Sequence, residues 1–193
     1  MQTRTKTIAA GMALSLTVLL AACGNGGPSK GDLKDGLEAQ DKAHPVQACW
    51  AVDNNANVSW PLRVPMNGMT QEQLGVIDGI NRSGIATVTT GPFNQNGIPM
   101  MVMTVDLTDK GKSANAWDPQ KGFCVGTRHV KDVNEFTIPG KGDENVTDVK
   151  YTWQYDDLPG WVERDKYPRL AGMTAPAADE AVLQKTSDGW RVQ

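Results

Sequence analysis

Hydrophobic and polar side chains alternate most regularly in the C-terminal half of the chain. Within residues 146–155, four apolar or aromatic side chains occupy alternate positions, and polar residues stand between them. The four are Val149, Tyr151, Trp153 and Tyr155. A period of two places them on one face of a strand, so the pattern predicts a half-buried antiparallel strand.

Short apolar runs separated by turn residues predict further strands of the same sheet. They are 123–127 and 133–138, with a turn at 139–143, and a terminal hairpin formed by 181–186 and 190–192. Residues 161–170 predict a short helix or an irregular segment, and residues 173–178 predict a loop.

The N-terminal half shows the spacing of helices. In the charged segment 31–42, Leu33 and Leu37 lie four residues apart, which predicts a helix with a narrow apolar face that ends before Pro45. Residues 46–52 then predict a short strand, followed by turn-rich residues 53–57.

A second helix is predicted over 71–81, where Thr70 is a good N-cap and Gln73 completes a capping box. A strand at 85–90 follows, and a loop containing Gly91-Pro92 and Asn96-Gly97 leads to a strand at 100–107.

This order of helix, strand and hairpin, continued by residues 107–112, loosely resembles a winged-helix unit. We therefore predict an α+β fold, in which an N-terminal helix and a small winged-helix-like helix and hairpin unit lead into a C-terminal antiparallel sheet. Residues 32–193 form one domain in this prediction, and residues 112–121 are the candidate boundary between its two units.

The first 22 residues have the layout of a signal peptide. Arg4 and Lys6 precede the uncharged stretch 7–22, whose apolar part is shorter than the roughly 20 residues of a membrane-spanning helix. The stretch ends in Leu20-Ala21-Ala22-Cys23, which resembles the bacterial lipobox. The resemblance implies that Cys23 receives diacylglycerol, becomes the first residue after cleavage and gains a third acyl chain. An ordinary secretory signal is the alternative.

Several acyl chains would hold the protein on a membrane permanently. Residues 23–31 are rich in glycine and predict a flexible tether. Gly24 follows the lipid-bearing cysteine, where an Asp would retain an enterobacterial lipoprotein at the inner membrane. The resemblance thus favours the outer membrane, with the domain in the periplasm.

Charge and cysteine content refine this picture. Of 19 basic residues, Arg4 and Lys6 lie in the signal segment, so 17 face 22 acidic residues and the net charge of −5 does not support nucleic-acid binding. Cys49 and Cys124 then remain, and in the oxidising periplasm we expect them to form a disulfide that closes a loop of about 76 residues. Two buried thiols, or a reactive Cys124 near His129, are the alternatives.

Candidate chemistry is sparse. Soft thioethers bind Cu(I), although methionine also fills irregular cores, and five methionines qualify: Met66, Met69, Met100, Met101 and Met103. His44 and His129 lie far apart and no HExxH or CxxC motif occurs, so we expect neither a zinc site nor a cofactor. The acids of Asp156-Asp157 and 163–165 suggest either glycan hydrolysis or a solvated loop.

Most of the six tryptophans are expected in the core. Trp161, beside Pro159-Gly160, is the candidate protein contact, with packing over a sheet edge as the alternative. The segments 123–126, 149–153, 158–162 and 187–190 resemble uncharacterised proteobacterial envelope lipoproteins, a resemblance that spans residues 120–193 and implies a scaffold without catalytic residues.

We expect a lipid-anchored, non-catalytic periplasmic module that binds membrane lipid through acylated Cys23 and contacts an unidentified envelope protein through its sheet and loops. The alternatives are an envelope hydrolase that uses Cys124 or the acidic loop residues, and Cu(I) binding through the methionines.

Overall fold

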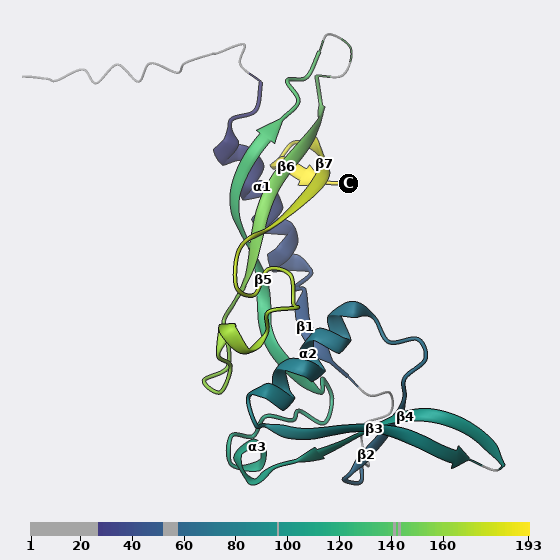
Figure 1. The fold of residues 1–193 in the computed structure, drawn as a ribbon. Coiled ribbons are helices and arrows are strands. Elements are labelled where there is room, and N and C mark those ends of the chain that lie inside the picture. Colours follow the sequence, from purple (N-terminus) through teal and green to yellow (C-terminus); the bar gives the residue numbers. More distant parts are fainter. Residues whose placement is uncertain (1–26, 52–57, 96, 141, 143) are drawn as a thin grey trace, which may run out of the picture.

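The described part of the chain folds into two antiparallel sheets with helices packed against them, as a computed structural model shows (Figure 1). The structure describes residues 27–51, 58–95, 97–140, 142 and 144–193. The predicted α+β class, with a C-terminal antiparallel sheet, is confirmed. No helix in this part of the chain is long and apolar enough to cross a membrane.

The larger sheet has the strand order β1-β5-β6-β7-β8. Its strands are β1 (Gln47–Trp50), β5 (Phe123–Phe136), β6 (Val146–Asp156), β7 (Ala177–Thr186) and β8 (Gly189–Val192). The smaller sheet has the order β2-β4-β3, with β2 (Leu62–Pro65), β3 (Ala86–Gln95) and β4 (Ile98–Leu107).

Helix α1 (Lys30–Ala43) begins inside the segment predicted as a flexible tether. Ser29 caps it, because the Ser29 hydroxyl accepts a hydrogen bond from the amide of Asp32 and the Asp32 carboxylate accepts one from the amide of Ser29. The predicted tether 23–31 is therefore wrong for residues 30 and 31, and residues 23–26 lie outside the described part of the chain.

α1 covers one face of the larger sheet and forms a first core with it. Leu33 and Leu37 are buried against Val149, Leu183 and Trp190, and burying each leucine stabilises the fold by roughly 1.5–3 kcal/mol. The alternating apolar face predicted for β6 supplies the centre of this core.

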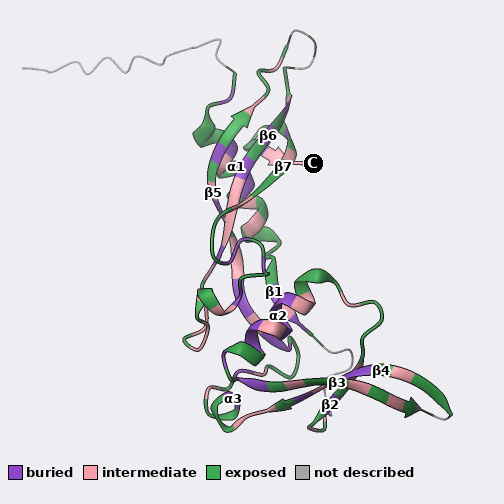
Figure 2. Ribbon diagram, viewed as in Figure 1, coloured by how far each residue is buried: buried purple, intermediate pink, exposed green. Residues whose placement is uncertain are grey.

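Helix α2 (Gln71–Arg82) joins the two sheets. Its predicted N-cap and capping box are both present, at Thr70 and Gln73. The second core contains buried side chains from α2, from both sheets and from residues 157–176 (Figure 2). Because Trp117 contacts Trp50 and Phe123 in this core, residues 112–121 do not separate two independent cores. Residues 107–112 of the winged-helix-like pattern include part of a short helix, α3 (Asp109–Ser113).

Three β segments differ from the prediction. β2 was not predicted. β5 is one continuous strand with two register shifts, near Val130 and Val133, where two strands were expected. β3 continues through Gly91-Pro92, which were expected in a loop. β3 is an edge strand, and the amide of Val88 bonds to the Asn81 side chain on α2, away from β4. Pro92 lies four residues after Val88, so its backbone nitrogen also points away from β4. The missing amide hydrogen of proline therefore costs no hydrogen bond to β4.

The C-terminal region also differs from the sequence prediction in its details. β7 begins at Ala177, so the predicted loop 173–178 ends earlier. Residues 161–170 are irregular apart from the 3-10 turn Arg164–Lys166, and the terminal hairpin is present.

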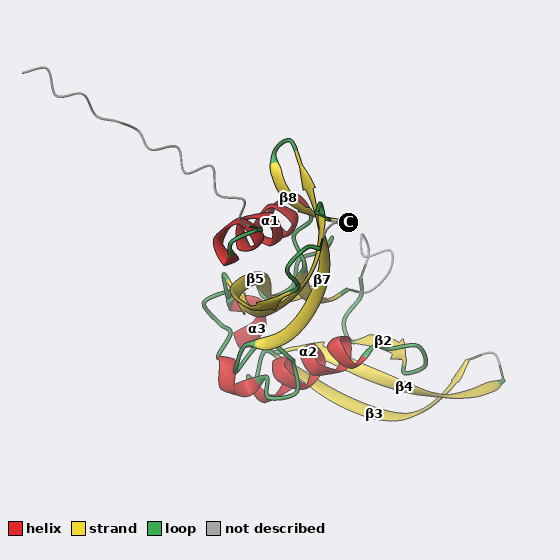
Figure 3. Cartoon of the chain, turned by 90° about the horizontal axis from the view of Figure 1, so that it is seen from above, coloured by secondary structure: helices red, strands yellow, loops and turns green. Residues whose placement is uncertain are grey.

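The molecule is elongated, and different elements form its two ends (Figure 1). At one end Gly27 lies beside Pro139, in the connection between β5 and β6. At the other end the β3–β4 hairpin extends past α2 (Figure 3). β5, with 14 residues, runs between them, and at about 3.3 Å per residue it spans about 46 Å.

Candidate functional site

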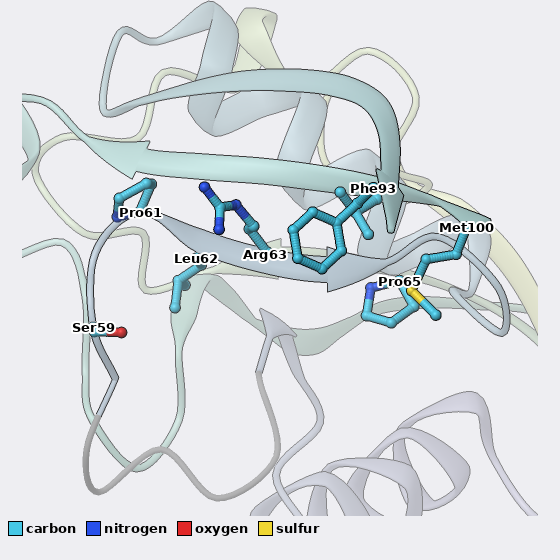
Figure 4. Close-up of a pocket in the computed structure, with 8 residues that line it drawn as sticks. Ser59, Pro61, Leu62, Arg63, Pro65, Phe93 and Met100 are labelled. Carbon is cyan, nitrogen blue, oxygen red and sulfur yellow. The ribbon is translucent and has the colours of Figure 1, made fainter. Parts of the chain in front are cut away.

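A hollow of about 400 Å³ lies on the face of the smaller sheet that points away from α2 (Figure 4). We call it the outer hollow. Most of its lining residues are apolar, although polar atoms make up the larger part of the exposed wall, and they come from β2, β3, β4 and the segment before β2. The lining residues are Ser59, Pro61, Leu62, Arg63, Pro65, Phe93, Met100 and Val102.

Strand register places five of these side chains on one face: Arg63, Pro65, Phe93, Met100 and Val102. Pro65 lies opposite Val102, and Phe93 lies opposite Met100, so each pair points to the same side of the sheet. Gly91 is the partner of Val102 on β3, and a Cβ added there would meet no atom within 4 Å. Gly91 therefore adds no side chain to this face of the sheet.

Arg63 is the charged group of the outer hollow. Its guanidinium lies over the ring of Phe93, with Cζ 5.2 Å from the ring centroid, which is a cation–π contact (Figure 4). None of the ion pairs between described residues includes Arg63. The hollow thus combines apolar side chains with the positive charge of Arg63, which can meet a carboxylate from outside.

Exposed apolar side chains continue around the same end of the sheet. Among described residues, six large apolar side chains are exposed, and three of them lie at this end of the sheet: Ile98 on the outer face, and Met66 and Met101 on the opposite face. Such an accumulation marks an interaction surface more often than scattered single residues do.

The opposite face carries a smaller hollow of about 250 Å³ between α2 and the sheet, which we call the inner hollow. Leu74 and Met103 line it, and the Asp78 carboxylate at its rim pairs with Arg82 at 2.9 Å. Its charges are therefore largely satisfied within the chain.

Cys49 and Cys124 are joined by a disulfide, with an S–S distance of 2.06 Å. They are direct neighbours on β1 and β5. A bonded Cys124 has no thiolate, so the hypothesis of a nucleophile at Cys124 has no reactive group while this bond is closed. His129 instead pairs with Asp157, 2.7 Å away.

Of the acidic residues considered for hydrolysis, Asp156 is the most strongly held by cations. Asp156 accepts hydrogen bonds from Lys131 at 2.5 Å and from Arg164 at 2.8 Å. Partial burial disfavours the charged form of Asp156, but these two cations outweigh that effect and lower its pKa. A carboxylate held ionised in this way is poorly suited to act as a general acid.

Trp161 is half-buried and packs against the second core, so its proposed role as a protein contact stays a prediction. No group of three His, Cys, Asp or Glu side chains in the described part of the chain could hold a metal ion. Cys23 and Gly24 lie outside the described residues.

Sequence reasoning missed Arg63 and Phe93. The available signal was weak, because a four-residue strand bordered by Pro61 and Pro65 has little pattern of its own. Neither a family model, nor a curated protein, nor a solved structure matches this chain.

Proposed function

We propose that this protein is a lipid-anchored periplasmic lipoprotein that acts as a non-catalytic interaction module, and that the outer hollow is its contact surface for an envelope protein. The observation that carries the proposal is Arg63, which joins no ion pair between described residues and lies over Phe93 among mostly apolar lining residues, with the exposed Ile98 on the same face of the sheet.

The arrangement of the two ends supports an anchored module. The lipobox-like motif Leu20-Ala21-Ala22-Cys23 precedes Gly27 by a few residues, and Gly27 lies at the end of the molecule far from the smaller sheet (Figure 1). A lipid on Cys23 would hold that end near the bilayer, with the outer membrane favoured by Gly24. The length of β5 would then separate the outer hollow from the lipid surface.

The residues that line the outer hollow indicate what kind of partner segment it would bind. Arg63 can bind a carboxylate through two parallel hydrogen bonds, while the partly exposed Phe93 and Met100 offer apolar contact. The partner we propose is an envelope protein with an extended segment that places an Asp or Glu beside apolar residues.

The hydrolase alternative gains no support from the geometry. Cys124 is bonded to Cys49, and Asp156 is held by two cations. The second alternative, Cu(I) binding, depends on the methionines between residues 66 and 103.

Site-specific photo-cross-linking in living cells tests the proposed contact. A photoreactive residue at Thr89, which lies on the outer face next to the hollow, should form a cross-link to one envelope protein. The same residue at Glu180, on the solvent face of the larger sheet, is the matched control and should not.

The charge at Arg63 makes the test specific. R63E should abolish the Thr89 cross-link, whereas R63K should weaken it, because lysine keeps the charge and loses the two parallel hydrogen bonds. The cross-linked peptide should contain an acid beside apolar residues. The proposal is contradicted if the cross-link survives R63E, or if Thr89 and Glu180 capture the same proteins equally.

A further inference from the structure

Five methionines lie between residues 66 and 103, and the smaller sheet sorts them by face. Met100 points to the outer face, where it lines the outer hollow. Met103 lies on the other face, where it lines the inner hollow with Leu74. Met101 is two positions from Met103 on β4 and therefore shares its face.

Met66 joins this inner face. Its amide donates a hydrogen bond to the carbonyl oxygen of Met101 at 3.2 Å, directly beyond the last register pair of β2 and β4, Pro65 with Val102. The two methionines are thus cross-strand neighbours, and side chains in that relation start about 5 Å apart at their Cβ atoms. Because methionine side chains are flexible, both sulfur atoms can approach the same metal ion.

Met69 approaches the same region from a turn. Gly68, with a φ of +84°, reverses the chain after β2, and the Met69 side chain packs against the second core, to which Met103 also belongs. Met66, Met101 and Met103 therefore share the inner face of the smaller sheet, and Met69 follows the turn that ends β2.

Exposure distinguishes this group from ordinary core packing. Met101 is 50% exposed and Met66 is 36% exposed, whereas Met103 is 5% exposed. A methionine that only fills a core is expected to be buried, whereas Met66 and Met101 are exposed side by side. The group has a buried floor and an open side from which an ion could enter.

We propose that Met66 and Met101 form a binding site for one Cu(I) ion, with Met103 as its floor. Thioether sulfur is a soft ligand that selects Cu(I) over harder ions such as Mg²⁺ or Ca²⁺. The site lies on the opposite face of the sheet from the outer hollow, so it stands independently of the proposed protein contact.

A competition titration against a chromogenic Cu(I) chelator tests the site. The full chain is used without oxygen, with ascorbate as reductant, and every variant carries C23S so that the thiol of Cys23 does not compete. Met1 and Met12 are present throughout and cancel in the comparison. We expect the C23S protein to withdraw one equivalent of Cu(I) from the chelator.

Substitution by leucine preserves volume and removes the sulfur. M66L and M101L should each weaken Cu(I) binding at least tenfold. M100L is the matched control, since Met100 adjoins Met101 but faces the other side, and it should change the affinity by less than twofold. The proposal is overturned if the protein withdraws no Cu(I), or if M100L weakens binding as much as M101L does. Equal urea unfolding midpoints for the three variants would show that the differences come from the sulfur atoms.

Discussion

The guanidinium of Arg128 lies over the indole ring of Trp153, with Cζ 4.5 Å from the ring centroid. It also donates hydrogen bonds to the Tyr151 hydroxyl and, at 2.7 Å, to the Asp179 carboxylate. Arg128 belongs to β5, Trp153 and Tyr151 to β6, and Asp179 to β7. One side chain therefore ties together three strands of the larger sheet.

Replacing Arg128 by methionine should destabilise the fold by about 1–3 kcal/mol. The Arg128 side chain is only 16% exposed, so its loss leaves the Asp179 carboxylate partly desolvated without its cation. Urea unfolding measures the change in the free energy of unfolding. The control is K150M, because the Lys150–Glu135 pair is solvent-exposed and should contribute less than about 0.5 kcal/mol. Equal effects of the two substitutions would contradict the structural role of Arg128.

Asp179 also predicts how stability depends on pH. Partial burial disfavours its charged form, but Arg128 and the amide of Glu180 outweigh this and lower the pKa of Asp179. A lowered pKa in the folded state stabilises the protein above the unfolded value of about 3.9, and this contribution disappears as the pH falls through the folded pKa. The free energy of unfolding should therefore fall between about pH 5 and pH 2, and less steeply in D179N. Parallel curves for the two proteins would disprove the assignment.

Two glycines of α2 form a matched pair for a packing test. A Cβ at Gly79 would lie 2.0 Å from the ring of Tyr167, so G79A must displace that ring and should destabilise the fold by about 1–3 kcal/mol. A Cβ at Gly75 would lie 3.6 Å from Leu170, which is an ordinary contact. G75A should therefore stabilise by about 0.5–1 kcal/mol through helix propensity. Thermal or urea unfolding of both variants shows whether each substitution raises or lowers the free energy of unfolding. An increase in G79A would show that Tyr167 does not pack against Gly79.

The disulfide should account for a large share of stability. Replacing both Cys49 and Cys124 by alanine opens a loop of about 76 residues and should lower the free energy of unfolding by roughly 2–4 kcal/mol. Unfolding in urea with and without a reductant provides the check. Reduction should shift the parent protein to the midpoint of the double variant and leave that variant unchanged. A parent protein insensitive to the reductant in the unfolded state would contradict the pairing.

Local signals explain which parts of the fold were predictable. The capping box at Thr70 and the alternation in β6 are properties of neighbouring residues, and both elements form where predicted. With two cysteines left after Cys23, only one pairing inside the chain exists, and it is the pairing observed.

Elements that depend on distant partners escaped prediction. β2 has four residues and forms because β4 offers it an edge, as their hydrogen bonds show. The continuation of β3 past Pro92 depends on its position at the edge of the sheet. The outer hollow needs β2, β3 and β4 side by side, so no stretch of sequence could have placed Arg63 next to Phe93.

Lipid anchoring through Cys23 is the central claim, because it places every later contact in the cell envelope. Mass spectrometry of the intact protein, purified from membranes of its native host, tests it most directly. We predict a chain that begins at Cys23 and carries the mass of diacylglycerol plus an amide-linked acyl chain, and a C23A variant that lacks both. A chain that retains an unmodified Met1, recovered from the soluble fraction, would contradict the claim.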